Sequence, residues 1–155
     1  MSEYLLGDIE TNGLKPDRIW MVGIIDLVTD EYTAYIGDDQ VPIGLMRLAE
    51  AELVVGHNFK GYDAPVIKRL SDGLIDLTRV EDTLDISRKL FPARKSHSLE
   101  SWGLDFGFPK LHFKDFSTFS AEMVPYCERD VRLNKRLYEY LLDKEEAFER
   151  GEFTI

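Results

Sequence analysis

The sequence has a single cysteine, few basic residues for its acidic content and no long apolar run. Cys127 has no second cysteine to pair with, so no disulfide can form within the chain, and a reducing cytoplasm is the expected compartment. No apolar stretch approaches the ~20 residues of a membrane-spanning helix. The start of the chain, Met1 to Tyr4, is acidic and lacks the basic residues of a signal peptide. We therefore expect a cytoplasmic protein with no membrane partner.

The shortage of positive charge bears on nucleic-acid binding. There are 19 Lys and Arg residues against 29 Asp and Glu residues, which gives a formal net charge of −10. Taken alone, this balance argues against a nucleic-acid-binding protein, because contacts with phosphate are made mainly by Lys and Arg. The argument weakens if the carboxylates are clustered around divalent cations, which reverse the local charge. Composition therefore leaves this question to the motifs.

The patterns that are present predict one compact α/β domain over residues 1–155. The chain is 44% hydrophobic and 31% charged, and its 155 residues suit one globular domain. Apolar alternation predicts strands, and apolar residues three and four apart predict helices. Three strands come first, and strands and helices then mix, which indicates a mixed sheet, part antiparallel hairpin and part parallel crossover. Strands are expected at 4–9, 19–28, 31–36 and 53–56, and helices at 42–51, 62–70, 83–90, 98–106 and 120–150.

Two carboxylates lie at the end of the first predicted strand. Asp8 and Glu10 are two residues apart, and side chains two apart in a strand face the same side. Both are therefore expected to project together from the C-terminal end of this strand. The alternative interpretation is a pair of solvated acids where a strand becomes a loop.

A third carboxylate follows the fourth predicted strand. Residues 57–63, His-Asn-Phe-Lys-Gly-Tyr-Asp, lead from that strand to the start of a helix and place Asp63 there. Aspartate is also a favoured N-cap residue, so a purely structural role for Asp63 stays open.

The predicted C-terminal helix carries a fourth carboxylate. Positions four apart lie on one face of a helix, so Tyr126 and Asp130 share the apolar stripe that continues through Leu133, Leu137 and Leu141. A carboxylate on a buried stripe is costly unless it is paired or bound to a metal ion. A buried salt bridge is the alternative to a metal ligand here.

Three separate segments thus deliver carboxylates to one side of the predicted sheet. Such oxygen ligands suit Mg²⁺ or Mn²⁺ better than zinc, since no second cysteine and no paired histidine accompanies them. Two ions about 3.5–4 Å apart could clamp the attacking and leaving oxygens of a phosphodiester displacement.

These segments resemble the motifs of DEDD 3′→5′ exonucleases, in the subtype with a tyrosine four residues before the last aspartate. The matching motifs are Asp8–Leu14, His57–Asp63 and Tyr126–Asp130, and the segments Glu81–Arg88 and Ser96–Gly103 extend the resemblance over nearly the whole chain. The sequence is most similar to the proofreading domain of family A DNA polymerases from short-tailed phages. The resemblance implies a ribonuclease H-like fold, a mixed β-sheet flanked by α-helices. Since the chain ends where the polymerase portion would begin, we expect a stand-alone, phage-encoded exonuclease in the host cytoplasm, with a separate polymerase as its candidate partner.

The resemblance also implies roles for individual residues. Asp8, Glu10, Asp63 and Asp130 would hold two divalent cations, Mg²⁺ or Mn²⁺, and Tyr126 would hydrogen-bond the attacking water. A tyrosine with an ordinary pKa near ~10 is a poor base at neutral pH, so we expect Tyr126 to orient the water.

Three further residues are implied in substrate binding. Thr11 and Leu14 would contact the terminal nucleotide, and Asn58 would contact the strand nearby. Leu14 has an alternative interpretation as a core residue that packs under Trp20.

The expected function is hydrolysis of single-stranded DNA, or of frayed 3′ ends, to 5′-mononucleotides. Two alternatives remain: an RNase that trims short RNA, and a non-catalytic nuclease-fold subunit of a replication complex. The intact carboxylates and Tyr126 speak against the non-catalytic subunit, whereas nothing in the sequence separates DNA from RNA.

A basic run stands apart from these motifs. Arg88, Lys89, Arg94 and Lys95 place positive charges close together in an otherwise acidic chain. Such a run is usually a solvated surface, and the alternative is that it guides the backbone of a bound strand.

Overall fold

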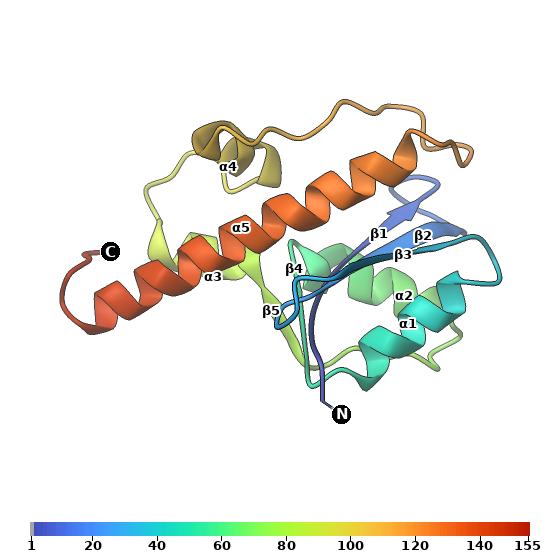
Figure 1. Ribbon diagram of the computed structural model, residues 1–155, viewed down its shortest axis with the longest axis horizontal. Coiled ribbons are helices and arrows are strands. Elements are labelled where there is room, and N and C mark those ends of the chain that lie inside the picture. Colours follow the sequence, from blue (N-terminus) through green and yellow to red (C-terminus); the bar gives the residue numbers. More distant parts are fainter. Residues whose placement is uncertain (1) are drawn as a thin grey trace.

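The computed structural model of the protein describes residues 2–155 and contains a mixed five-stranded sheet (Figure 1). The strand order is β3-β2-β1-β4-β5. Strand β1 pairs antiparallel with β2, β2 pairs antiparallel with β3, and β4 and β5 run parallel to β1. The bounds are β1 Tyr4–Thr11, β2 Ile19–Asp26, β3 Tyr32–Ile36, β4 Leu53–Gly56 and β5 Val80–Asp82.

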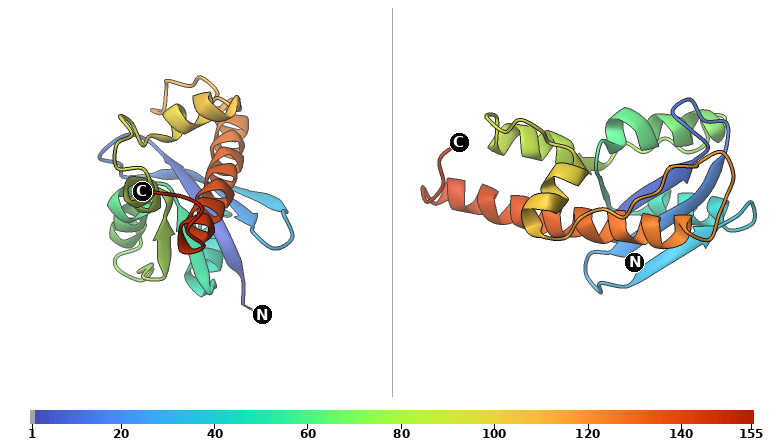
Figure 2. Two further views of the ribbon diagram at one scale, coloured as in Figure 1. Left: turned by 90° about the vertical axis from the view of Figure 1, so that its left-hand side faces the viewer. Right: turned by 90° about the horizontal axis from the view of Figure 1, so that it is seen from above.

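Helices cover both faces of this sheet (Figures 1 and 2). Helices α1 (Val41–Glu50) and α2 (Ala64–Leu70) pack on one face, and α2 follows a π-helical turn, η1 (Phe59–Asp63). The long helix α5 (Met123–Glu149) crosses the other face. Helices α3 (Thr83–Leu90) and α4 (Leu99–Phe106) pack against the C-terminal half of α5.

Side chains along β1 point alternately to the two faces of the sheet, one covered by α1 and α2 and the other by α5. Leu5 and Ile9 pack with the core of α1 and α2, whereas Leu6 packs with Val131 of α5. Residues two apart in a strand share a face, so Asp8 and Glu10 lie on the side of Leu6. Both carboxylates therefore point toward α5.

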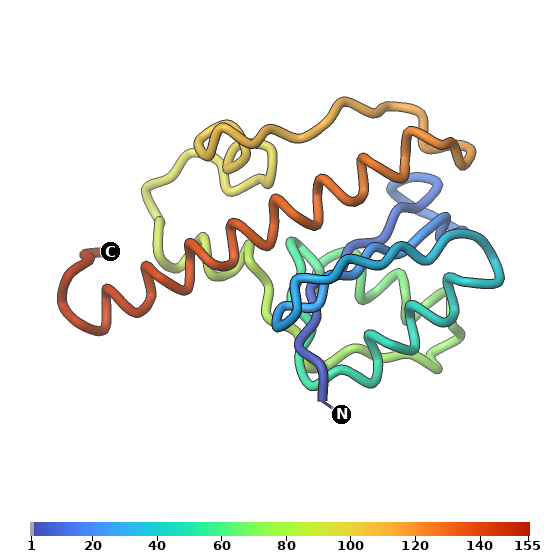
Figure 3. The backbone as a smooth tube through the Cα atoms, viewed as in Figure 1, coloured from blue at the N-terminus to red at the C-terminus, as the bar shows by residue number. Residues whose placement is uncertain are grey.

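A long connection without regular secondary structure precedes α5. Segment 107–122 leaves α4 and returns alongside the N-terminal half of α5 (Figure 3). It is attached to the helix by Arg129, whose Nε donates a hydrogen bond to the carbonyl oxygen of Pro109 at 2.8 Å. The guanidinium of Arg129 also lies 3.6 Å from the centre of the Phe108 ring. The connection therefore forms a wall beside α5.

The structure confirms the α/β class and the mixed sheet. It differs from the sequence prediction at the ends of several strands and helices and by one additional strand. Strand β1 continues past Ile9 to Thr11, because a register shift after Glu10 lets Thr11 pair with Ile19. Strand β5 was not predicted, since three residues show no alternation and are extended through pairing with β4. Helix α5 begins at Met123 instead of residue 120, with Pro125 in its first turn, where a missing N–H leaves no bond unmade. Within residues 2–155, no helix is both long and apolar enough to span a membrane.

Candidate active site

Strand β1 places two carboxylates against the N-terminal half of α5. One oxygen each of Asp8 and Glu10 and the sulfur of Cys127 all lie within 4.8 Å of one another. The close approach of α5 depends on Gly23, which pairs with Asp8 across β1 and β2. A Cβ at Gly23 would come within 2.8 Å of the Cys127 sulfur, so a larger residue there would push the helix away from the carboxylates.

Asp63 reaches the same site from η1. Its Oδ2 accepts a hydrogen bond of 3.1 Å from the backbone N–H of Ile9, between the two carboxylates of β1. Asp63 does precede α2, but its side chain makes no capping hydrogen bond, so the N-cap interpretation is wrong. The loop before it is held by Asp82, which accepts hydrogen bonds from the backbone N–H groups of Asn58 at 2.8 Å and Lys60 at 3.0 Å.

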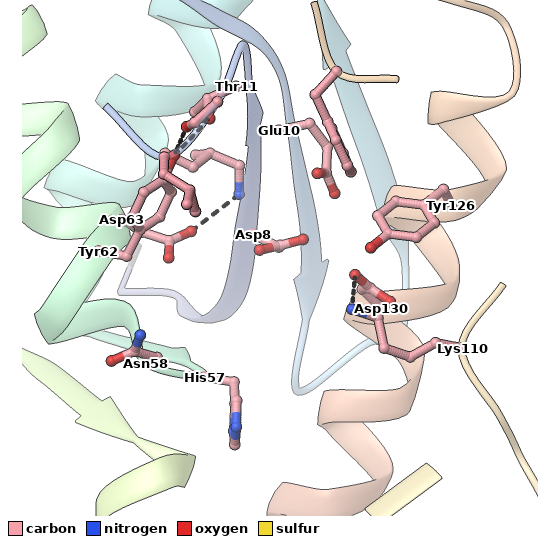
Figure 4. Close-up of a pocket in the computed structure, with 14 residues that line it drawn as sticks. Asp8, Glu10, Thr11, His57, Asn58, Tyr62, Asp63, Lys110, Tyr126 and Asp130 are labelled. Carbon is pink, nitrogen blue, oxygen red and sulfur yellow. Dashed lines mark hydrogen bonds and ion pairs between the residues drawn. The ribbon is translucent and has the colours of Figure 1, made fainter. Parts of the chain in front are cut away.

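Helix α5 supplies Asp130 and Tyr126 from the opposite side (Figure 4). Asp130 is 7% exposed, and its Oδ2 pairs with Lys110 Nζ at 3.4 Å. The same ammonium lies 5.2 Å from the centre of the Tyr126 ring. Sequence reasoning missed Lys110, because a single lysine in an irregular segment carries no periodicity or motif that would distinguish it from surface lysines.

These side chains line one open cavity of about 440 Å³, together with the three expected substrate contacts. Leu14 is 91% exposed, so its interpretation as a core residue is wrong. Tyr62, which sequence reasoning did not select, fixes the loop that carries Leu14: its hydroxyl lies 2.6 Å from Thr11 Oγ1 and donates to the carbonyl oxygen of Gly13 at 2.7 Å. The cavity lining includes Asp8, Glu10, Thr11, Leu14, Asn58, Asp63, Lys110, Phe116, Tyr126 and Asp130.

Burial and crowding raise the pKa values of all four carboxyl groups. Burial, followed by the charge of Asp130, raises the pKa of Asp8 to about 7. Burial raises the pKa of Asp130 to about 6, although the Lys110 ammonium lowers it. The pKa values of Glu10 and Asp63 lie well above their usual range, first through burial and next through the charge of Asp8. One lysine does not balance this cluster, which is the situation that bound cations relieve.

The donor atoms fit divalent metal ions. Two buried carboxylate oxygens, Glu10 Oε2 and Asp130 Oδ1, have no hydrogen-bond partner among residues 2–155. Buried polar atoms normally have a partner, so these oxygens are available to a ligand. Cys127 does not change the hard character of the donor set, because burial raises the pKa of its thiol and keeps it neutral.

The mixed sheet, covered by helices on both faces, has a ribonuclease H-like fold. A family model of the RNase H superfamily matches residues 5–108, more than half of the chain. The protein therefore belongs to the RNase H superfamily. This membership agrees with the resemblance of its motifs to those of DEDD exonucleases. No curated protein sequence matches the chain.

Solved structures share this fold at low sequence identity. A nuclease in its apo form is 20% identical, with a TM-score of 0.74 over 97% of this chain and 75% of that chain. Brucella melitensis NrnC with bound Mg²⁺ is 17% identical, with a TM-score of 0.73 over 98% of this chain and 77% of that chain. The family B DNA polymerase of Pyrobaculum calidifontis is 18% identical, with a TM-score of 0.69 over 92% of this chain and 25% of that chain.

Proposed function

We propose that residues 1–155 form a single-domain, metal-dependent 3′→5′ exonuclease that hydrolyses single-stranded DNA, or frayed 3′ ends, to 5′-mononucleotides. The observation that carries this proposal is the convergence of four carboxylates and Tyr126, from β1, η1 and α5, on one open cavity. The bound Mg²⁺ of Brucella melitensis NrnC, which shares the fold, supports a divalent metal. The preference for DNA over RNA rests on the resemblance to polymerase proofreading domains.

The metal ligands in this proposal are Asp8, Glu10, Asp63 and Asp130. Two divalent cations, Mg²⁺ or Mn²⁺, would lower the pKa of the attacking water and stabilise charge on the attacking and leaving oxygens. The protein holds the ligands in place beforehand: the backbone N–H of Ile9 fixes Asp63, and Lys110 fixes one oxygen of Asp130.

Tyr126 would orient the attacking water. Burial, followed by the charge of Asp130, raises the pKa of its hydroxyl, which therefore keeps its proton at neutral pH. A protonated hydroxyl can direct a water molecule by hydrogen bonding but cannot act as a general base. Its ring is held by Phe113 and Phe116, with ring centres 5.5 Å and 5.8 Å away, so the hydroxyl position is defined.

The loop after β1 would position the terminal nucleotide. Thr11 is anchored by Tyr62, and the exposed Leu14 stands at the rim of the cavity, where it would wedge between the last two bases. Asn58, which also lines the cavity, would contact the strand nearby. Apolar and stacking contacts of this kind read no sequence, so the enzyme should accept all terminal bases.

A panel of end-labelled oligonucleotides tests the proposal. With Mg²⁺ or Mn²⁺, 3′-labelled single-stranded DNA should lose its label first and release 5′-mononucleotides, because the attack falls on the terminal phosphodiester. Intact duplex should be cleaved more slowly, and a 3′-phosphate should block digestion. Parallel reactions use RNA and excess chelator. Early release of a 5′ label, or cleavage in chelator, contradicts the proposal, and faster cleavage of RNA would assign the enzyme to RNA trimming instead.

Leu14→Ala is expected to slow cleavage of single-stranded DNA about 10- to 100-fold, since the scissile phosphate would be misplaced. Thermal stability should hardly change, because the side chain is 91% exposed. The measurements are single-turnover rates on strands with each terminal base, and the melting temperature.

Leu74→Ala is the matched control, since Leu74 is 89% exposed and lies outside the site. It should cleave like the unmodified protein. If Leu14→Ala cleaves equally well, Leu14 does not position the substrate.

A further inference from the structure

A second cavity opens beside the carboxylates. It measures about 640 Å³ and shares part of its wall with the first cavity, including Asp8, Asn58 and Lys110. Its remaining wall comes from α3, the loop after it and the first turn of α4, where Arg88, Lys95 and neighbouring polar residues line it. The two cavities therefore form one continuous groove with the metal-ligand candidates at the junction.

The structure divides the basic run into two pairs with different surroundings. Arg94 Nη1 pairs with Asp105 Oδ2 at 2.7 Å, and its guanidinium lies 3.6 Å from the Trp102 ring centre. Lys89 Nζ lies 3.5 Å from Glu145 Oε2 on α5. These two cations serve the packing of α3 and α4 against their neighbours.

Arg88 and Lys95 differ from the other pair. Both are exposed, both line the second cavity, and neither lies within 4.0 Å of a carboxylate oxygen among the described residues. Exposed basic side chains are commonly only solvated. Here, however, two unpaired cations face the same cavity, next to the acidic site of a protein whose net charge is −10.

This wall is also held in place by hydrogen bonds. Ser87 Oγ lies 2.6 Å from His97 Nδ1 and accepts a hydrogen bond from Trp102 Nε1 at 2.9 Å. These contacts join α3, the following loop and α4. The backbone segments that carry Arg88 and Lys95 are therefore held by the fold, which lowers the cost of binding an anion there.

We propose that Arg88 and Lys95 form a binding site for the phosphate backbone of the strand on the 5′ side of the cleaved bond. The inference rests on the proposed function. The first cavity offers Leu14, Tyr62 and Phe116 to a base and sugar, and the carboxylates with their metals take the scissile phosphate. A strand that continues through the groove brings its next phosphates to the two cations. Such contacts are independent of sequence and favour substrates longer than the terminal nucleotide.

The test compares two substrates across protein variants. One substrate is the p-nitrophenyl ester of thymidine 5′-monophosphate, which has a scissile phosphodiester but no further phosphate. The other is an eight-nucleotide thymidylate strand. The ratio of kcat/KM for the strand to kcat/KM for the ester should fall at least about tenfold in the double variant Arg88→Gln, Lys95→Gln. Lys89→Gln, which removes a neighbouring charge outside the groove, should leave the ratio unchanged.

Binding measured without turnover separates this inference from the proposed function. Fluorescence anisotropy of the labelled strand with Ca²⁺ should show binding that is about tenfold weaker in the double variant, with a salt slope reduced by about 0.7 for each lost phosphate contact. If the unmodified protein cleaves neither substrate, the proposed function is wrong, and the binding comparison still decides the backbone site. An unchanged ratio, or binding equal to that of Lys89→Gln, overturns the inference.

Discussion

Asp8→Asn is expected to reduce the rate of cleavage by roughly three orders of magnitude or more. Metal-ion stabilisation of a transition state is worth several kcal/mol, and each ~1.4 kcal/mol is a factor of ten in rate. Asp130→Asn should behave in the same way, because its Oδ1 is one of the two buried carboxylate oxygens that have no hydrogen-bond partner among residues 2–155. Single-turnover kinetics with saturating Mg²⁺ and Mn²⁺ measure both effects.

The Asp8→Asn substitution should not destabilise the metal-free protein at pH 8. The folded-state pKa of Asp8 is raised from 3.8 to about 7, so its ionised form is disfavoured by the fold. The folded state favours the protonated carboxyl of Asp8. This contribution to the free energy of unfolding is fully present below pH 3.8 and is lost as the pH rises through about 7. Asparagine stays neutral, so the metal-free variant should melt at the same or a higher temperature at pH 8, and the difference should vanish near pH 4.

A metal titration supplies a measurement that does not depend on activity. Mg²⁺ or Mn²⁺ should raise the melting temperature of the unmodified protein, since a ligand that binds the folded state stabilises it. The rise in melting temperature should be much smaller for Asp8→Asn. For Asp143→Asn, which replaces an exposed carboxylate farther along α5, the rise should equal that of the unmodified protein. Equal metal stabilisation of all three proteins, or undiminished cleavage by Asp8→Asn, would falsify the metal assignment.

Tyr126→Phe is expected to slow cleavage by roughly 10²- to 10⁴-fold, because the hydroxyl that orients the attacking water is lost. The loss should appear in the chemical step, measured by single turnover at saturating metal. The fold should survive, because the ring keeps its contacts with Phe113 and Phe116.

Tyr140→Phe is a suitable control for this substitution. Tyr140 lies on the same helix, packs its ring against Phe91 with centres 6.0 Å apart, and is outside both cavities. Removing its hydroxyl should leave the rate unchanged. If Tyr126→Phe is as fast as Tyr140→Phe, Tyr126 is a core aromatic and the water is oriented by another group.

Local periodicity predicted a large part of the site. Asp8 and Glu10 face the same side of β1, and Asp130 lies on the buried stripe of α5, as the spacing indicated. The prediction missed the end of β1 at Thr11 and the start of α5 at Met123, because contacts outside the local pattern decide where an element begins or ends.

The sequence by itself determined which carboxylates share a face, because strand and helix periods act between residues only two to four positions apart. It also determined the mixed sheet, through the order of apolar segments. Those signals are local, and they identified Asp8, Glu10 and Asp130 before any contact was known.

Only the tertiary structure decided how distant segments meet. It decided between the two sequence interpretations of Asp63, whose side chain bonds to β1 instead of capping α2, and it brought Lys110 to Asp130. It also separated Arg88 and Lys95 from the rest of their run. These contacts depend on how α3, α5 and the connecting segments pack on the sheet, and no pattern within a few residues encodes such distances.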